Sequence, residues 1–561
     1  MERSAILAEP YGFVVAHLRN LGILIVASLL LFFWQLGDIP FYERGEPREG
    51  LVVAEMVASG NLILPQVNGE YIPFKPPLFH WLGVAAVKMF GRLDEFTLRL
   101  PSALLGMLGV LLTYWLGARL WSARVGLIAG VILLSNIQWW IGATNVQVDM
   151  ALTFFLIASV FSFLMLYRGA AVAAWQSAGL AILLACGTLS KGPLGLVLPC
   201  LTFMIFLALR HDFAFIKKLN PWWNGALFLL VVGSWYGLAI WQGGAPFILR
   251  QIIDENFRTA TGEYGHPQAL HYFVPVLLSN LTLWSFFLLP LGISRWRREP
   301  MWQGNEVTYL LIWFAVVFTL FSLSSGKRAI YILPLYPACA LVLGAWWSEM
   351  ESKAKIDKVT LTIGYVIATI YLLGVALALG WRLTADISRY LPKGQNFTFI
   401  ARILVENFAL LRSGIFISGI AVLIAFGALY RRRPDYLFAA FATLAIFAVL
   451  IVKSVFYPTV AREQTLKPFV ARVAQLAEDG APLLFYRAFD AGVILYLQRH
   501  VRSYQDLAPV AQKPYYLLLW EEDWLRLRGI NGLELLATSH GTGPARRHHM
   551  MLVRAMENLP L

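Results

Sequence analysis

Long apolar runs alternate with short polar connections along most of this chain, from Leu21 to Lys453. Most of these runs approach the roughly 20 residues that an α-helix needs to cross the hydrocarbon core of a bilayer. The pattern therefore predicts a polytopic α-helical membrane protein. The candidate segments are 21–37, 77–90, 98–118, 125–142, 149–167, 175–190, 193–209, 222–241, 271–292, 306–325, 329–348, 359–381, 413–430 and 434–452.

Basic residues indicate which of these segments cross, because Lys and Arg in short loops stay on the inner side of a membrane. If every segment crossed, several basic loops would fall outside. The stretch PLFHWLGVAAVKMF at 77–90 is short and carries His80 and Lys88, so we expect a re-entrant or interfacial helix there. About 13 crossings then remain. The basic loops that fall inside as a result are 119–124, 168, 210–218, 295–298, 353–358 and 431–433.

The chain changes character after residue 454. APLLFY and PYYLLLW have the composition of short buried strands, whereas FVARVAQLAE and AGVILYLQRH are amphipathic with the helical period. This alternation predicts a small α/β domain over 455–561, on the outer side, after a membrane domain over 1–454 with a long first outer loop at 38–97. The C-terminal domain has no glycine-rich phosphate loop, so binding or capping is favoured over catalysis.

Composition agrees with a membrane protein and narrows the function. Hydrophobic residues make up 58% of the chain, charged residues only 14%, and mean hydropathy is +0.63. The net charge of +13 does not indicate nucleic-acid binding, because the basic residues sit in short loops between apolar runs. Cys186, Cys200 and Cys339 lie inside apolar segments, with neither metal-ligand spacing nor a disulfide pattern. The N-terminus has no convincing cleavage site, so 21–36 is predicted to be a retained first helix.

Charged residues also gather in the segments expected on the outer side, at the edge of the membrane. Ionisable groups at that depth usually face a cavity and serve function. Several cations would hold a lipid-linked phosphate, while a carboxylate would take the proton of an incoming hydroxyl. The residues are Glu43, Arg44, Glu46, Arg48 and Glu49 in the first loop, Lys75 before the interfacial helix, Asp149, Lys191, then Arg258, Glu263 and His266 in the 242–270 loop, and Lys327 and Arg328 in SSGKR.

Structural roles remain open for several of these residues. Glu46 or Arg48 would also suit the dipole at a helix N-terminus, and Asp149 would suit a helix cap. Lys75 would also suit a side chain that reaches lipid headgroups. His266 is more often an ordinary loop histidine than a metal ligand.

A series of motifs in fixed order resembles the membrane glycosyltransferases of the C-type fold (GT-C). The motifs are GEPREGLVVAEM, FKPPLFHWL, RLPSALLG, DMALTFF, LSKGPLGLVLP, HYFVPVLL and SLSSGKRAIYILPLYP. The chain is similar over residues 20–350 to the protein O-mannosyltransferases (family 39) and to the aminoarabinose transferases that modify lipid A. The resemblance implies thirteen helices, juxtamembrane helices in the first outer loop and an outer C-terminal domain.

The resemblance also implies the chemistry. The donor would be a monosaccharide on polyprenyl phosphate, transferred with inversion on the periplasmic face of the inner membrane to a lipid, glycan or protein acceptor. The phosphate-binding cations implied are Lys75, Lys191, Arg258, Lys327 and Arg328, with Arg48 beside them. No metal ligand is assigned, and a divalent metal stays open as a cofactor.

The sequence departs from the family pattern at the residue that is presumed to act as the catalytic base. The family opens the first outer loop with an Asp-Glu pair whose Asp is the presumed base, whereas this chain has Gly45-Glu46 there. Glu49 stands where a tyrosine usually follows the arginine. We therefore expect Glu46 to act as the base, with Glu43 as second choice. Asp149 matches the family's second acidic position and would orient the acceptor or share the base role.

Two other functions stay open. The first is an oligosaccharide ligase or oligosaccharyl transferase of the same broad fold, which would hold a larger donor. The second is a transporter or flippase for a lipid-linked sugar, with charges along its pathway. Transporters usually show inverted repeats and broken helices at mid-membrane. The candidate charges here are instead concentrated on the outer side of the membrane, which favours a transferase.

Overall fold

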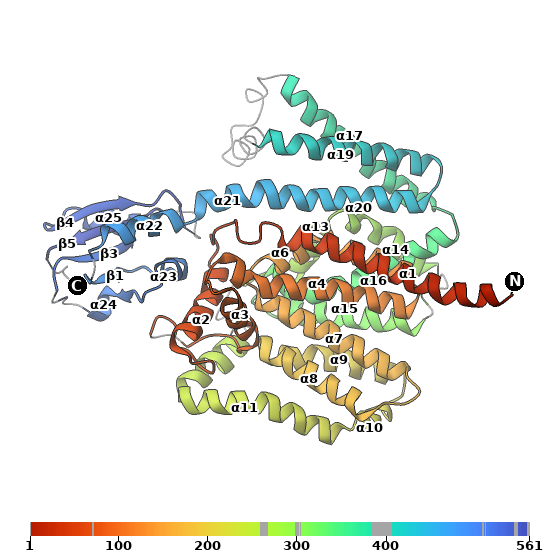
Figure 1. The fold of residues 1–561 in the computed structure, drawn as a ribbon, viewed down its shortest axis with the longest axis horizontal. Coiled ribbons are helices and arrows are strands. Elements are labelled where there is room, and N and C mark those ends of the chain that lie inside the picture. The colour runs from red at the N-terminus through yellow and green to blue at the C-terminus, as the bar shows by residue number, and fades with distance from the viewer. Residues whose placement is uncertain are drawn as a thin grey trace.

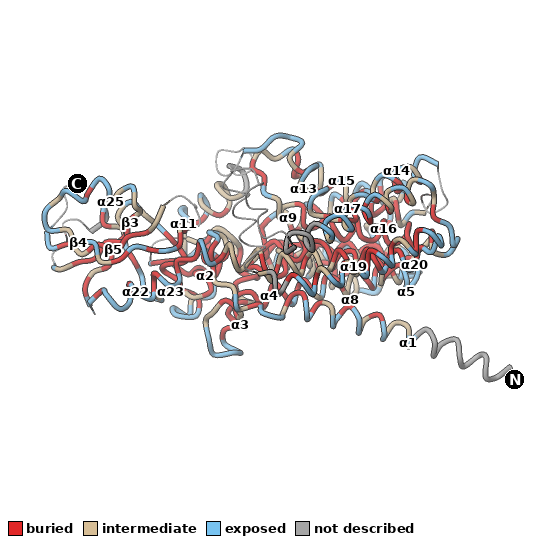
Figure 2. Tube along the Cα trace, turned by 90° about the horizontal axis from the view of Figure 1, so that it is seen from above, coloured by how far each residue is buried: buried red, intermediate tan, exposed pale blue. Residues whose placement is uncertain are grey.

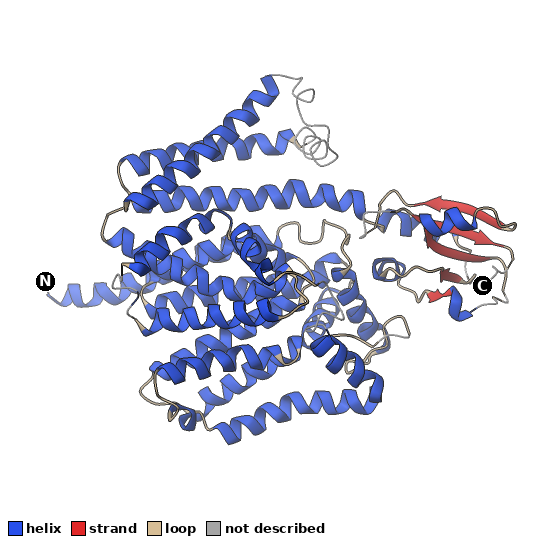
Figure 3. Cartoon of the chain, turned by 180° about the vertical axis from the view of Figure 1, so that it is seen from behind, coloured by secondary structure: helices blue, strands red, loops and turns tan. Residues whose placement is uncertain are grey.

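The computed structural model of the protein describes residues 2–557 apart from 70–71, 259–266, 298–301, 303, 384–406, 479, 508–509, 511 and 544–547. Most of the chain is helical, and a small sheet lies near the C-terminus (Figures 1 and 3). The long helices run along the long axis of the molecule, with the sheet beyond one end of the bundle and the N-terminus at the other (Figure 1).

The helical part extends to Gln464. Its elements are α1 (Glu2–Ser28), η1 (Leu29–Phe33), α2 (Gly45–Ser59), α3 (Leu78–Phe90), α4 (Glu95–Leu120), α5 (Ala123–Leu134), α6 (Ile137–Thr144), α7 (Val148–Arg168), α8 (Ala174–Lys191), α9 (Leu194–Leu209), α10 (Phe215–Lys218), α11 (Pro221–Phe247), η2 (Ile248–Arg258), η3 (Leu270–Tyr272), α13 (Phe273–Asn280), η4 (Thr282–Phe287), α14 (Leu288–Trp296), α15 (Asn305–Leu323), η6 (Ala329–Leu335), α16 (Tyr336–Ser352), α17 (Lys358–Leu383), α19 (Phe408–Tyr430), α20 (Pro434–Ile451), η8 (Val452–Phe456) and α21 (Tyr457–Gln464).

Among the described residues, nine helices are long and apolar enough to cross a membrane, or eleven if each of two bent pairs counts as one span. The bent pairs are α5 with α6, at 70°, and the helices on either side of Leu281, at 111°. The remaining predicted crossings correspond to α8 and α9, of 18 and 16 residues. The segment 77–90 forms the short helix α3, which has 13 residues, and its interfacial position stays a prediction. The polytopic helical architecture is confirmed.

The outer surface of the helical part has the character of a lipid-facing surface. In α11, Trp222 and Trp241 are 92% and 80% exposed, and they bracket Leu229 and Leu230, which are 67% and 68% exposed. At the helical rise of about 1.5 Å per residue the two tryptophans lie about 28 Å apart. This matches the roughly 30 Å hydrocarbon core with aromatic side chains at both interfaces. Buried positions instead fill the middle of the bundle and the sheet (Figure 2).

The basic loops gather at the end of the bundle away from the sheet. Arg124, in the first turn of α5, forms an ion pair of 2.7 Å with Glu351 at the end of α16. Arg168 and Glu306 lie 3.2 Å apart, and Arg210 donates to Asn305 Oδ1 at 3.0 Å. Turns that the charge pattern assigned to one side therefore lie together in space.

At the opposite end, a buried ion pair joins the first loop to the helices. Glu46 in α2 and Arg99 in α4 are 1% and 3% exposed. Arg99 Nε donates to Glu46 Oε1 at 2.8 Å and Nη2 donates to Oε2 at 2.9 Å. The other guanidinium nitrogen donates to the carbonyls of Leu36 and Ile39, at 3.0 and 2.6 Å. The Val146 amide donates to Glu46 Oε1 at 3.0 Å, so one ion pair holds four segments together.

The last span leads into the C-terminal domain without a loop. Helices α20, η8 and α21 follow one another from Pro434 to Gln464 and form one long rod in Figure 1. Lys453 in this rod is 5% exposed and donates to backbone carbonyls at the end of the first span, including Leu31 at 3.0 Å. A cation suits that position, because the last carbonyls of a helix lack intrahelical donors.

The C-terminal domain is a five-stranded sheet with short helices. Its elements are α22 (Lys467–Leu476), β1 (Leu483–Phe485), α23 (Ala491–Leu497), β2 (Arg502–Ser503), α24 (Tyr504–Leu507), β3 (Tyr515–Trp520), α25 (Glu521–Leu527), β4 (Leu533–Thr538) and β5 (Met550–Ala555). The strand order is β2-β1-β3-β5-β4, with parallel pairs on the β2-β1-β3 side and antiparallel pairs on the β3-β5-β4 side. β1 and β3 contain the two segments predicted as buried strands.

This domain packs against the first loop through polar contacts. The Tyr496 hydroxyl accepts from the Phe41 amide at 2.7 Å and donates to Glu95 Oε1 at 2.8 Å. Lys467 Nζ lies 2.6 Å from the same Glu95 oxygen. Asn68 exchanges two hydrogen bonds of 2.9 Å with the Val501 backbone. The first loop is therefore fixed between the helical bundle and the C-terminal domain.

We expect Glu46→Gln to lower the melting temperature of the purified protein, because it leaves Arg99 as a buried charge without its partner. Removing one member of a buried pair usually costs about 3–5 kcal/mol. The exposed carboxylate of Glu534 on β4 provides a matched control, and Glu534→Gln should leave the melting temperature unchanged. Equal melting temperatures for wild type and Glu46→Gln would show that the pair does not stabilise the fold.

We expect Tyr496→Phe to loosen the contact between the first loop and the C-terminal domain. The change removes the acceptor of the Phe41 amide and one donor to buried Glu95, at a cost of about 1–3 kcal/mol. Hydrogen–deuterium exchange should become faster in the peptide that contains Phe41. Tyr486→Phe removes a hydroxyl in the same domain that makes no hydrogen bond to the described residues, and should leave that peptide protected.

Candidate active site

An ion pair between Asp149 and Lys191 lies at the sheet-facing end of the bundle. Asp149 is in the first turn of α7 and Lys191 is the last residue of α8, positions that favour an anion and a cation respectively. Gly192 ends α8 with a positive φ of 78°, which places Lys191 at the end of the helix. The two side chains are 10% and 7% exposed, and Lys191 Nζ donates to Asp149 Oδ1. Lys191 Nζ also lies 4.3 Å from the centre of the Tyr331 ring.

A second group of charges comes from the first turns of α2 and α3. Arg48 Nη2 donates to Glu49 Oε1 at 2.7 Å, and His80 Nε2 lies 2.9 Å from Glu49 Oε2. Burial alone would raise the pKa of Glu49. The charge of Arg48 and the hydrogen bonds from His80 and Arg48 outweigh burial and hold the pKa well below its usual range. Glu49 therefore stays ionised and accepts protons poorly.

Lys75, in the loop before α3, pairs with Glu255 of η2. Burial and then the neighbouring ammonium of Lys191 lower the pKa of Lys75 to about 7, although the carboxylates of Glu49 and Asp149 act in the opposite direction. Lys75 is thus the cation of this group whose charge changes near neutral pH.

These groups form one cluster. Arg48 is close enough to interact electrostatically with Asp149 and Tyr331 as well as with Glu49. A cavity of about 260 Å³ adjoins the cluster, close to the lower end of the size range of small-molecule pockets. Arg48, Glu49 and Phe74 line it from the first loop, Arg250 from η2 and Phe489 from the C-terminal domain. Arg250 lies 4.0 Å over the Phe74 ring.

The other expected site residues lie elsewhere. Glu46 has both carboxylate oxygens bonded to Arg99, and Glu43 is exposed before α2. Lys327 is 4% exposed and donates to the Gln268 carbonyl at 3.0 Å, so it holds the 267–268 segment to the SSGKR turn.

Arg328 is exposed at the start of η6. Arg258 is the last residue of η2, and its side chain lies outside the described residues, as do Glu263 and His266. Among the residues that the structure does describe, no group of three His, Cys, Asp or Glu side chains could hold a metal ion.

Several members of the cluster were not assigned a role from the sequence. His80 and Tyr331 lie inside apolar segments, and nothing in the surrounding sequence distinguishes them from residues of the hydrophobic core. Glu255 lies in η2, and no local sequence pattern indicates that this segment approaches Lys75. Glu49 could have been assigned, because it replaces the tyrosine that usually follows the arginine.

The arrangement suits displacement of a phosphate ester. Three cations stand within one cluster, where they would stabilise a departing phosphate. Asp149 Oδ1 accepts from Lys191, and its Oδ2 accepts no hydrogen bond from the described residues. Oδ2 is therefore available to accept a proton.

Comparison with known proteins shows the fold and the proteins to which this chain is similar. Residues 74–236 match the family described as dolichyl-phosphate-mannose-protein mannosyltransferase. The chain is 26% identical over 363 residues, 64% of each protein, to an undecaprenyl phosphate-alpha-4-amino-4-deoxy-L-arabinose arabinosyl transferase of Enterobacter sp. (strain 638). The structure of ArnT from Cupriavidus metallidurans bound to undecaprenyl phosphate superposes with a TM-score of 0.77, at 19% identity, over 95% of this chain and 97% of that one.

A more distant structure shares the same fold. The oligosaccharyltransferase AglB from Archaeoglobus fulgidus superposes with a TM-score of 0.50 at 13% identity, over 90% of this chain and 69% of that one. The resemblance inferred from the motifs is thereby confirmed. The chain has the GT-C fold and is similar to membrane glycosyltransferases named as undecaprenyl phosphate-aminoarabinose arabinosyl transferases.

Proposed function

We propose that this protein transfers a monosaccharide from a polyprenyl-phosphate donor to a lipid, glycan or protein acceptor, with Asp149 as the general base. The observation that carries the proposal is the buried Asp149–Lys191 pair beside Lys75 and Arg48, in a chain similar to arabinosyl transferases named for an undecaprenyl-phosphate sugar. The structure of a similar fold bound to undecaprenyl phosphate supports the same donor class.

In the proposed reaction, an acceptor oxygen or nitrogen attacks the anomeric carbon from the side opposite the phosphate. A new bond forms to this carbon as the bond to the phosphate oxygen breaks, which inverts the configuration. The electron pair leaves with the polyprenyl phosphate, whose charge Arg48, Lys75 and Lys191 stabilise. The proton of the acceptor passes to Asp149 Oδ2 and then to water.

Asp149 is favoured over Glu46 as the base for a geometric reason. An acceptor must be able to reach the base, and Glu46 is 1% exposed with both oxygens held by Arg99, whereas the Asp149 side chain is 10% exposed. Glu49 is disfavoured because its low pKa makes it a weak base. Gly45 stands where the family usually has its base, and in this proposal Asp149 of α7 takes over that role.

The three cations already have carboxylate partners. Arg48 pairs with Glu49, Lys75 with Glu255 and Lys191 with Asp149. An incoming phosphate would compete with these carboxylates, of which Glu255 is the most exposed, at 23% against 7% for Glu49 and 10% for Asp149. We therefore assign Glu255 as the partner that a donor phosphate displaces from Lys75.

The distribution of basic residues supports a proposed location for the site and the two domains. The basic loops lie at the end away from the site, and basic loops stay inside. We place the site and the domain over 455–561 on the periplasmic side of the inner membrane, with residues 1–454 as the transferase domain. The alternative, an oligosaccharyl transferase, is supported only by the general fold it shares with AglB.

We expect Asp149→Asn to lower sugar transfer by about 100-fold or more, the usual effect of losing a general base. The assay would use purified protein in lipid with radiolabelled polyprenyl-phosphate sugars. Binding of undecaprenyl phosphate should persist, because the three cations remain. Glu46→Gln serves as the comparison, and its activity should fall only in proportion to the folded fraction.

Two outcomes would contradict this assignment. A well-folded Glu46→Gln protein without turnover, alongside an active Asp149→Asn protein, would place the base in the first loop. A wild-type protein that neither binds nor turns over any donor of a broad panel would contradict transfer itself and favour transport.

Affinity for undecaprenyl phosphate should fall as pH rises through the pKa of Lys75. Below about 7 Lys75 is charged and attracts the phosphate, whereas above it each binding event must first take up a proton. The affinity should therefore fall by up to about tenfold per pH unit between pH 7.5 and 9. Binding titrations over that range would measure the slope.

Lys75→Arg should flatten this pH dependence, because a guanidinium stays charged over the whole range. Lys327→Arg provides a control outside the cluster and should keep the wild-type slope. Equal slopes for wild type and Lys75→Arg would show that Lys75 is not the titrating cation.

A further inference from the structure

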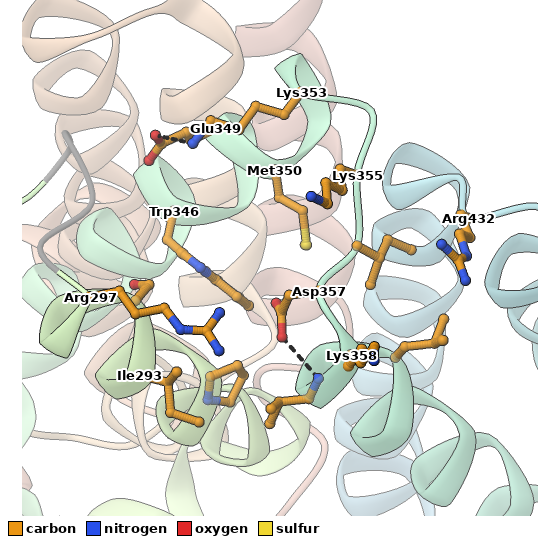
Figure 4. Close-up of a pocket in the computed structure, with 15 residues that line it drawn as sticks. Ile293, Arg297, Trp346, Glu349, Met350, Lys353, Lys355, Asp357, Lys358 and Arg432 are labelled. Carbon is orange, nitrogen blue, oxygen red and sulfur yellow. Dashed lines mark hydrogen bonds and ion pairs between the residues drawn. The ribbon is translucent and has the colours of Figure 1, made fainter.

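A large cavity lies at the basic end of the bundle, away from the candidate active site. It has a volume of about 470 Å³ and opens between the ends of α14 and α16, the start of α17 and the α19–α20 turn. Figure 4 shows Arg297 on one side of it and Arg432 on the other, with Lys355, Asp357 and Lys358 between them.

The charges of this cavity are unbalanced. Its two carboxylates are engaged, because Glu349 pairs with Lys353 at 2.7 Å, and Asp357 accepts from the Val359 and Thr360 amides at the start of α17. Four further cations line the cavity, and no carboxylate of the described residues pairs with them. They are Arg297, Lys355, Lys358 and Arg432.

Apart from Ser294, the rest of the lining is apolar. Pro290, Ile293 and Leu361 contribute hydrocarbon surface, and Trp346, 4% exposed, lies among them. A small hydrophilic anion would not use this surface. A phosphate attached to acyl chains would use both parts of the lining.

The depth of the cavity matches that of lipid headgroups. Trp296 and Tyr430 are each 84% exposed, and they directly precede Arg297 and the basic run that contains Arg432. Exposed Trp and Tyr side chains at helix ends mark the interface between hydrocarbon and water. Basic pockets between transmembrane helices on the inner side bind anionic headgroups.

We propose that this cavity binds the phosphate headgroup of an anionic phospholipid from the leaflet at this end. These four cations hold the phosphate, and the apolar lining holds the first part of the acyl chains. The bound lipid would bridge α14, the α16–α17 connection and the α19–α20 turn.

The test measures lipid retention by native mass spectrometry of the whole protein in mild detergent. Wild type should retain phosphatidylglycerol in preference to phosphatidylcholine. The variant Lys355→Gln/Arg432→Gln should lose about 25-fold in affinity for phosphatidylglycerol, at about fivefold per cation removed. The control Lys217→Gln/Arg431→Gln removes two exposed cations at the same end that do not line the cavity, and should bind as wild type does.

A second variant distinguishes loss of lipid binding from loss of folding. Lys355→Arg/Lys358→Arg keeps the charges and should retain phosphatidylglycerol, with a melting temperature that the lipid raises as in wild type. Loss of the lipid by this variant, or equal loss by the control, would overturn the proposal. So would a melting temperature that responds to inorganic phosphate but not to phosphatidylglycerol, because the site would then bind the free ion.

Discussion

The buried pair of Glu46 and Arg99 is the contact on which the end of the molecule with the candidate active site depends. It ties α2 to α4, the link before α7 and the chain that leaves the first span. Neither charge is stable alone at that depth, since a buried ion without a partner costs several kcal/mol. The first loop therefore has a fixed position, and Arg48, Glu49 and Lys75 are held where Asp149 and Lys191 reach them.

The same constraint governs the candidate active site. Every cation of the cluster has a carboxylate partner, so the site is close to neutral before a donor arrives. Affinity for a phosphate then depends on exchanging one anion for another. The carboxylates lower the electrostatic free energy of bringing several cations together in a region of low dielectric constant. A ligand displaces one of them more readily if it carries more negative charge than a carboxylate.

The spans, the short helix at 77–90 and the gathering of the basic loops could be predicted, because hydropathy and loop charge are local properties of the sequence. The C-terminal strands could be predicted from short apolar runs for the same reason. The partners of individual charges could not be predicted. Arg99 lies 53 positions from Glu46, and nothing near Glu46 in sequence indicates that this carboxylate is already occupied. Tyr331 and Glu255 likewise reach the cluster only through the packing of distant segments.

The rod from Pro434 to Gln464 has a mechanical consequence. A helix without a loop transmits tilt, and spans tilt to match the thickness of the bilayer around them. The C-terminal domain is attached to this rod and, through Tyr496 and Lys467, to Glu95 beside the first loop. The domain is therefore held at two points, so the rod can change its angle to the first loop only if the contacts of Tyr496 and Lys467 with Glu95 break.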